Sequence, residues 1–255
     1  MLKRTFQFLM LACLSCSLCW AANDPFVGKW KLNSSKTRMF DVMKVASAGA
    51  DKYSFIFEGT DSETIVTDGT DQPGLQGTTL SVAMEDTHTW KVVRKKDGRM
   101  LLTAIWTLSE DGNTLRDAFS TPQPDGSTFT IVYVYQRIAG TSGFSGNWES
   151  TSQDVITAAE MQIQLSENNG LSITLPQAIG ISGSIKLDGK DYAISQDVTS
   201  SGRRIDDLTV EIIYKKKGKA VVTQELKLSS DRKTVALTVN QIGKSKPDII
   251  VFDRE

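Results

Sequence analysis

One duplication constrains the fold of this chain more than any other feature. The pattern Phe-x-Gly-x-Trp stands at Phe26–Trp30 and again at Phe144–Trp148, 118 positions later. The segment Val92–Leu115 matches Ile212–Val235 in the same order, at an offset of 120 positions. Self-similarity at a nearly fixed offset is typical of repeated folding units, so the sequence predicts two copies of one domain.

The same comparison gives the ends of the two copies. The first copy closes on an apolar segment that ends with Arg137, and the second closes in the same way with Arg254. The short stretch Ala139–Ser142, which contains Gly and Ser, joins them as a hinge or a tight connection. We therefore predict one domain over residues 23–139 and a second over residues 143–255.

The first 22 residues have the character of a signal peptide. Lys3 and Arg4 precede the apolar run Phe8–Leu18, which is too short to span a bilayer, and Ala21 and Ala22 are small residues suited to cleavage. The sequence therefore predicts an exported protein, periplasmic or secreted. A lipid anchor is the less favoured alternative, because all three cysteines of the chain lie in this segment: Cys13, Cys16 and Cys19.

Composition narrows the classes of partner. The 29 basic and 30 acidic residues nearly balance, and no concentrated basic face is evident, so we expect no nucleic acid as partner. After the signal segment no stretch approaches the roughly 20 apolar residues of a transmembrane helix, so we expect no membrane span in the mature chain. Loss of that segment would also remove every cysteine and with it any disulfide.

Within each copy the apolar residues alternate with a period of two. In Arg99–Ser109 the even positions, among them Ala104 and Trp106, are apolar and share one face. Turn signals such as Asp97-Gly98 separate such runs, which number about eight or nine per copy. The pattern favours an all-β protein made of two tandem antiparallel up-and-down barrels, with an immunoglobulin-like sandwich as the rival. Two stretches, 35–50 and 152–160, are expected to be short helices or flaps.

The ends of the two copies resemble those of lipocalins and related calycins. That family opens its first strand with Gly-x-Trp and carries an arginine on its last strand; the chain also looks like exported bacterial lipocalin-like domains. The resemblance implies closure of each barrel within its own copy, with the guanidinium of Arg137 across the indole of Trp30, and Arg254 across Trp148. No Thr-Asp-Tyr motif follows in mid-chain, so no ligand identity carries over. The matching residues are Gly28, Trp30, Arg137, Gly146, Trp148 and Arg254.

The same inward geometry predicts a binding site. If Arg137 points toward Trp30, then Tyr133 and Tyr135 on its strand point inward as well, and Trp106 joins them from a neighbouring strand. These five residues would line an aromatic cavity for a small apolar or amphipathic ligand, and a filled aromatic core is the alternative. The corresponding places of the second copy suggest a packed or purely apolar interior: Gln224, Leu226, Ile250 and Phe252.

We find no pattern that indicates a catalytic, metal or cofactor site. His88 is the only histidine and has no diagnostic partners, and the Asp-Gly pairs match turns better than calcium loops. The basic hairpins at 94–99 and 215–219 are expected to be solvated tips. The sequence therefore predicts a non-catalytic protein that binds a hydrophobic or amphipathic ligand. A structural or inhibitory protein-interaction module with filled barrels is the alternative.

Overall fold

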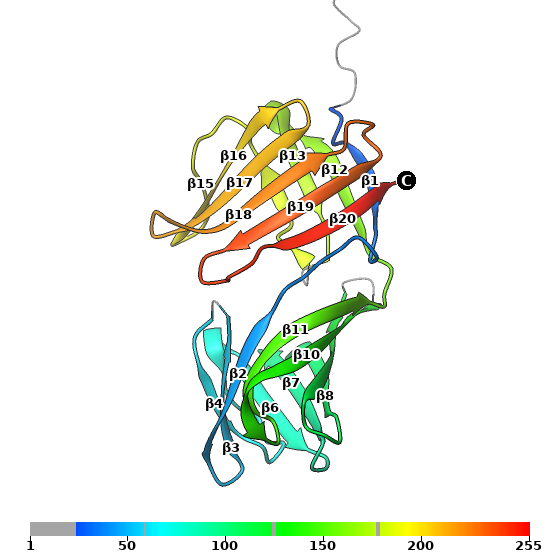
Figure 1. The fold of residues 1–255 in the computed structure, drawn as a ribbon. Coiled ribbons are helices and arrows are strands. Elements are labelled where there is room, and N and C mark those ends of the chain that lie inside the picture. The colour runs from blue at the N-terminus through cyan, green and yellow to red at the C-terminus, as the bar shows by residue number, and fades with distance from the viewer. Residues whose placement is uncertain (1–23, 59, 124–125, 177–178) are drawn as a thin grey trace, which may run out of the picture.

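Two ten-stranded antiparallel sheets make up almost the whole protein (Figure 1). The structure is a computed structural model that describes residues 24–58, 60–123, 126–176 and 179–255, so the predicted signal peptide lies outside the described residues. One sheet curls into a nearly closed barrel and the other into a half-barrel, which we also call a barrel below, and the prediction of an all-β fold with two tandem barrels is confirmed. Among the described residues, no helix has the length and apolar character needed to cross a membrane.

We name the barrel formed mainly by the first copy the N-barrel. Its sheet has the order β4-β3-β2-β11-β10-β9-β8-β7-β6-β5, with the short 3₁₀ helix η1 (Leu75–Gly77) between β5 and β6. The strands are β2 (Val42–Gly49), β3 (Lys52–Phe57), β4 (Glu63–Val66), β5 (Gln72–Pro73), β6 (Thr79–Met84), β7 (Thr89–Lys96), β8 (Arg99–Leu108), β9 (Thr114–Pro122), β10 (Thr128–Ser142) and β11 (Ser145–Val155).

The other barrel, the C-barrel, has the order β14-β13-β12-β1-β20-β19-β18-β17-β16-β15. A second 3₁₀ helix, η2 (Glu167–Asn169), lies between β12 and β13. The strands are β1 (Gly28–Leu32), β12 (Glu160–Ser166), β13 (Gly170–Thr174), β14 (Gly183–Ile185), β15 (Tyr192–Ser195), β16 (Val198–Asp206), β17 (Thr209–Lys216), β18 (Lys219–Leu228), β19 (Thr234–Gln241) and β20 (Asp248–Arg254).

The two copies exchange their first strands. β1 lies between β12 and β20 of the C-barrel, where Figure 1 shows the blue strand beside the red one. β11, which carries the second Phe-x-Gly-x-Trp, lies between β2 and β10 of the N-barrel. The strand pairing therefore divides the chain differently from the predicted boundaries of 23–139 and 143–255.

The arginine–tryptophan contacts follow this exchange. The guanidinium carbon of Arg254 lies 4.0 Å from the ring centroid of Trp30, and that of Arg137 lies 4.2 Å from the ring centroid of Trp148. A cation does lie over an indole in each barrel, but the predicted pairings of Trp30 with Arg137 and Trp148 with Arg254 are wrong. A Cβ at Gly28 would lie only 2.9 Å from Arg254 Nη1. The glycine of the motif thus leaves room for the arginine.

A tight hairpin explains the exchange. The predicted connection Ala139–Ser142 belongs to β10, where Ala139 pairs with Asn147 and Ser142 with Ser145. Only Gly143 and Phe144 separate β10 from β11, so Trp148 reaches Arg137 through a local turn. Closing this short loop costs less entropy than bringing Trp30 to Arg137 from 107 positions away.

Two segments cross between the barrels as a result. Residues 33–41 lead from β1 to β2, and residues 156–159 lead from β11 to β12. The first crossing pairs with β20 through reciprocal backbone hydrogen bonds of Arg38 and Ile249, both 2.7 Å. The expected helices or flaps at 35–50 and 152–160 are therefore wrong, because these stretches form strands and the crossings.

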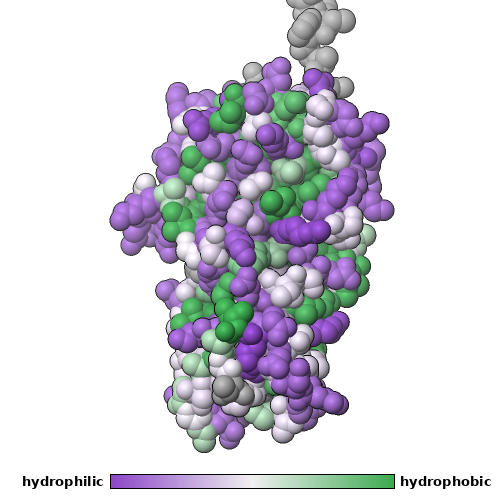
Figure 2. Space-filling view, viewed as in Figure 1, coloured by the Kyte–Doolittle hydropathy of each residue, from purple (hydrophilic) through white to green (hydrophobic). Residues whose placement is uncertain are grey.

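The turns and the surface agree with the sequence pattern. Asp97 and Lys217 adopt φ values of 50°, each followed by a glycine with positive φ, so both basic hairpins end in left-handed two-residue turns. On the face drawn in Figure 2, hydrophilic and hydrophobic residues are intermixed over both barrels. The residues at the turns of these hairpins are exposed, as predicted, but Arg94 is an exception, because its side chain points inward and pairs with Glu63.

Candidate functional site

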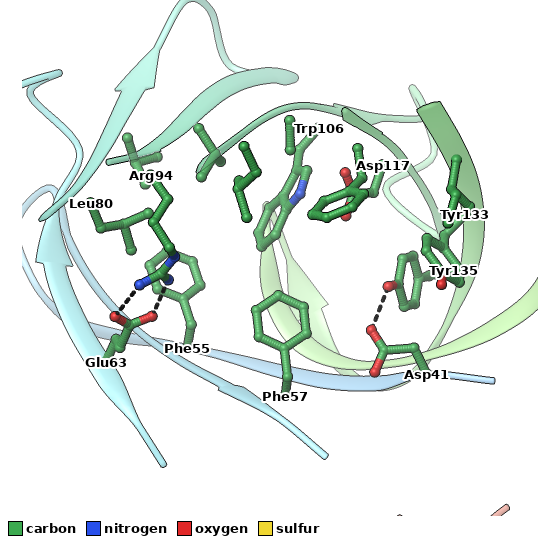
Figure 3. Close-up of a pocket in the computed structure, with 16 residues that line it drawn as sticks. Asp41, Phe55, Phe57, Glu63, Leu80, Arg94, Trp106, Asp117, Tyr133 and Tyr135 are labelled. Carbon is green, nitrogen blue, oxygen red and sulfur yellow. Dashed lines mark hydrogen bonds and ion pairs between the residues drawn. The ribbon is translucent and has the colours of Figure 1, made fainter. Parts of the chain in front are cut away.

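The N-barrel contains a cavity of about 350 Å³ that is partly open to solvent (Figure 3). Aromatic side chains form much of its wall, and aliphatic residues of β6, β7 and β8 complete it. Four ionisable residues also line it. The aromatic residues are Phe55, Phe57, Trp106, Phe119, Tyr133 and Tyr135, and the ionisable residues are Asp41, Glu63, Arg94 and Asp117.

Strand alternation brings these side chains together. Because successive residues of a strand face opposite sides, Leu102, Ala104 and Trp106 of β8 all line the cavity. Tyr133 and Tyr135 follow the same rule on β10. Ala104 is the smallest side chain of the wall, so this part of the barrel retains open space.

Ring contacts hold the aromatic wall in place. The Phe55 and Trp106 rings meet edge to face at 5.7 Å, and Phe57 meets Trp106 in the same way at 6.4 Å. Trp90 stacks on the far side of Trp106, with centroids 6.1 Å apart. Such pairs contribute about 0.5–1.5 kcal/mol each beyond the burial of their area. The wall is therefore largely formed before any ligand enters.

Two carboxyl groups lie at one end of the cavity. Tyr135 Oη donates a 2.7 Å hydrogen bond to Asp41 Oδ2, and burial raises the pKa of Asp41 to about 6. Asp117, only 6% exposed, is the direct cross-strand neighbour of Tyr133. Burial raises its pKa to about 7, partly offset by the Trp106 indole, and its Oδ1 has no hydrogen-bond partner among the described residues.

The other end of the cavity is closed by an ion pair. Arg94 Nη1 donates to Glu63 Oε1 at 2.9 Å and to Thr78 Oγ1 at 2.8 Å, while its Nη2 lies on the second carboxylate oxygen. Leu75 N also donates to Glu63, at 2.6 Å. Burial acts to raise the pKa of Glu63, but the bonds from Arg94 and Leu75 outweigh it, so this pKa lies below its usual value. The pair links β4 to β7 and is fully engaged.

The structure brings together three of the five residues predicted for the site. Trp106, Tyr133 and Tyr135 share the cavity wall, as Figure 3 shows. Trp30 instead lies in the core of the C-barrel. Arg137 lies at the far end of β10, where its Nε donates to Gly112 O at 2.8 Å and its ring contact is Trp148. Trp30 and Arg137 therefore do not line this cavity.

The four ionisable residues were missed by sequence reasoning. One signal was available for Asp117, because Leu115 and Phe119 share its face of β9 and both are apolar. A carboxyl on an apolar face predicts a buried acid. Asp41 carried no such signal, since it precedes β2 as the last residue of the crossing segment and lies outside any strand pattern.

The C-barrel interior has a different character. Phe252, Leu226 and Ile250 are buried there in one apolar cluster with Trp30. Gln224 is also buried, at 3% exposure, on the inward face of β18. Apolar side chains thus occupy the places that correspond to the polar end of the N-barrel cavity.

The described residues contain no group of three or more metal-ligating side chains. His88 is exposed in the turn between β6 and β7 rather than in a strand, with its Nδ1 2.9 Å from Thr87 Oγ1.

Comparison of the chain with protein-family models, with curated proteins and with solved structures finds no match. The chemistry of the N-barrel cavity is therefore the basis on which a function is inferred.

Proposed function

We propose that this protein is an exported, non-catalytic binding protein that holds a small hydrophobic or amphipathic ligand in the N-barrel. The observation that carries the proposal is the 350 Å³ cavity, which has a preformed aromatic wall and a few polar groups confined to its two ends. Binding sites for small molecules combine apolar lining with a few placed polar groups in this way. The likeness of the Gly-x-Trp and arginine ends to lipocalins points in the same direction.

The size of the cavity sets the expected affinity. A ligand that loses about 250 Å² of apolar surface to the wall gains roughly 6 kcal/mol. Loss of translational and rotational freedom opposes this gain. A micromolar affinity corresponds to about 8 kcal/mol. We therefore expect micromolar binding only for a ligand that also satisfies the polar end of the cavity.

The C-barrel would then serve as a support. Its interior is an apolar cluster, and its β20 pairs with the crossing segment that leads to Asp41. The alternative of a protein-interaction module with two filled barrels has less support, because one barrel is hollow.

Titration with the neutral fluorescent probe N-phenyl-1-naphthylamine tests the proposal. We expect one saturable site in the wild type and loss of binding in Ala104→Phe, whose ring would occupy the cavity. The matched control is Thr107→Phe on the same strand, because that side chain is exposed. Circular dichroism would establish that both variants fold. Absence of saturable binding, or equal binding by folded Ala104→Phe, would contradict the proposal.

A further inference from the structure

The polar end of the cavity contains one acceptor that no described residue satisfies. Asp117 Oδ1 is buried and has no hydrogen-bond partner among the described residues, although the carboxyl lines the cavity. Leaving a buried acceptor unpaired costs about 1–3 kcal/mol, and more when it is charged. Buried polar groups in proteins are nearly always paired. Trp90 Nε1 is also unpaired among the described residues but does not line this cavity, whereas Asp117 lines it, and there a ligand could supply the missing donor.

Two further acceptors surround the same place. Asp41 lies at this end of the cavity, with Tyr135 as its side-chain donor (Figure 3). Tyr133 is the cross-strand neighbour of Asp117, and among the described residues its hydroxyl makes one long contact, 3.9 Å to Met39 Sδ. The Tyr133 and Tyr135 rings lie 5.9 Å apart. Three acceptor groups and two aromatic rings thus share one corner.

The charges of the lining residues favour a cation. Three carboxyls and one guanidinium line the cavity, and Arg94 is already bonded to Glu63. The charge of Lys244 lowers the pKa of Asp41, but Lys244 is engaged with Asp248 at 3.0 Å. Asp41 and Asp117 therefore remain as acids without a dedicated counter-ion, and an anionic ligand would meet them with its own charge.

We propose that the N-barrel binds a small amine with an aromatic or other apolar body, whose ammonium group lies between Asp117, Asp41 and Tyr133. An ammonium group has three donors and no acceptor, which matches three acceptors that lack enough donors. The rings of Trp106, Tyr133 and Tyr135 offer cation–π contact to the head and apolar contact to the body. This inference rests on the proposed function and adds the class of ligand.

The two raised pKa values predict how the affinity for the amine changes with pH. Burial holds the pKa of Asp117 near 7 and that of Asp41 near 6, so both carboxyls become anionic as the pH rises from 5 to 8. The affinity for an ammonium group should rise over that range, while a carboxylate ligand would bind better at pH 5. The other titratable groups that face these carboxyls are Tyr133, Tyr135, Arg116, Lys244 and Asp248.

The C-barrel provides an internal contrast. By strand register, Leu237 occupies the place of Asp117. Asp117 pairs with Trp106 on one side and Tyr133 on the other. Leu237 pairs with Leu226 and Ile250 in the same way. An amine would find no acidic partner there. A single amine site per chain is therefore expected.

Competition against N-phenyl-1-naphthylamine tests the inference with three ligands of one shape: 2-phenylethylamine, 2-phenylethanol and phenylacetate. At pH 8 we expect the amine to displace the probe at least tenfold more effectively than the alcohol, and phenylacetate least of all. Asp117→Asn should weaken the amine at least tenfold and change the alcohol less than threefold. Asp41→Asn is the second variant, in case Asp117→Asn does not fold, and Asp154→Asn on the exposed face of β11 is the control.

The outcomes separate the two proposals. Three results would overturn the amine inference and leave the binding function standing. The amine and the alcohol could displace the probe equally, phenylacetate could displace it most effectively, or none of the three could displace a probe that binds. Failure of the probe itself to bind would overturn both. A tenfold loss for the amine in Asp154→Asn would also count against the inference, because it would show a diffuse charge effect.

Discussion

The two barrels share one strand plan and differ in what they enclose. In the N-barrel Trp148 pairs with Met43, and in the C-barrel Trp30 pairs with Met161, so the closed ends match in register. At the places where the N-barrel has Asp41, Asp117 and Tyr135, the C-barrel has buried apolar residues. Those residues are Ala159, Leu237 and Phe252.

This difference separates scaffold from function. The arginine–tryptophan contact occurs in both barrels, each time between neighbouring strands of the sheet. The inward residues of the remaining strands are free to differ, and they decide whether an interior is apolar throughout or hollow with a polar end. A duplicated fold can thus keep one copy as support while the other holds a site.

The largest test concerns the exchange of strands. We expect a fragment of residues 40–157 to fold on its own, because it contains all ten strands of the N-barrel. A fragment of residues 23–139 should be largely unfolded, because β11 has 11 residues and β1, its only substitute, has 5. Circular dichroism and urea unfolding of the two fragments provide the measurement. Cooperative urea unfolding of both fragments at the same midpoint would contradict the exchange of strands.

Removal of each closing tryptophan should affect one barrel selectively. Trp148→Ala and Trp30→Ala each delete a fully buried indole, and each should lower the stability of its barrel by about 3–5 kcal/mol. Trp148→Ala should abolish probe binding in the N-barrel, whereas Trp30→Ala should leave it within a few fold of wild type. Loss of probe binding in Trp30→Ala but not in Trp148→Ala would instead support barrels that each form within one copy.

The stability of the N-barrel should fall as the pH rises. The pKa of Asp117 is about 7 in the folded protein and near 3.8 when exposed, so the stability linked to its proton is complete below pH 4 and lost as the pH passes 7. At about 1.4 kcal/mol per unit, a difference of about three units corresponds to a loss of roughly 4 kcal/mol over the whole range. Asp117→Leu, which copies Leu237, should flatten this dependence in urea unfolding from pH 5 to 8. A wild type that gains stability over that range would show that Asp117 is ionised when folded.

The smallest effect is expected where the barrels agree. Lys95 pairs with Asp71 and Lys215 with Asp191, both at 2.8 Å and both substantially exposed. Exposed ion pairs contribute about 0.2–1 kcal/mol. Lys95→Met and Lys215→Met should each change the free energy of unfolding by less than 1 kcal/mol and to a similar extent. A large loss in one barrel alone would mean that the two surfaces are not equivalent.

Part of the fold and of the site could be predicted from particular residues. The alternation on β8 places Trp106 inward, and the alternation on β10 does the same for Tyr133 and Tyr135. The Asp97-Gly98 turn follows from local backbone preference. Each of these inferences needs only neighbours in the chain, which is why it could be made without tertiary structure.

By itself the sequence determined the duplication and the strand period, whereas the arginine across an indole was implied by the likeness to lipocalins. Only the tertiary structure decided which arginine meets which tryptophan, because both copies present the same groups and differ in the length of chain between them. It also decided that Asp41 and Asp117 share one corner, since the strand order places these residues around one cavity. Local patterns specify what a segment can bury, whereas the pairing of strands specifies what it is buried against.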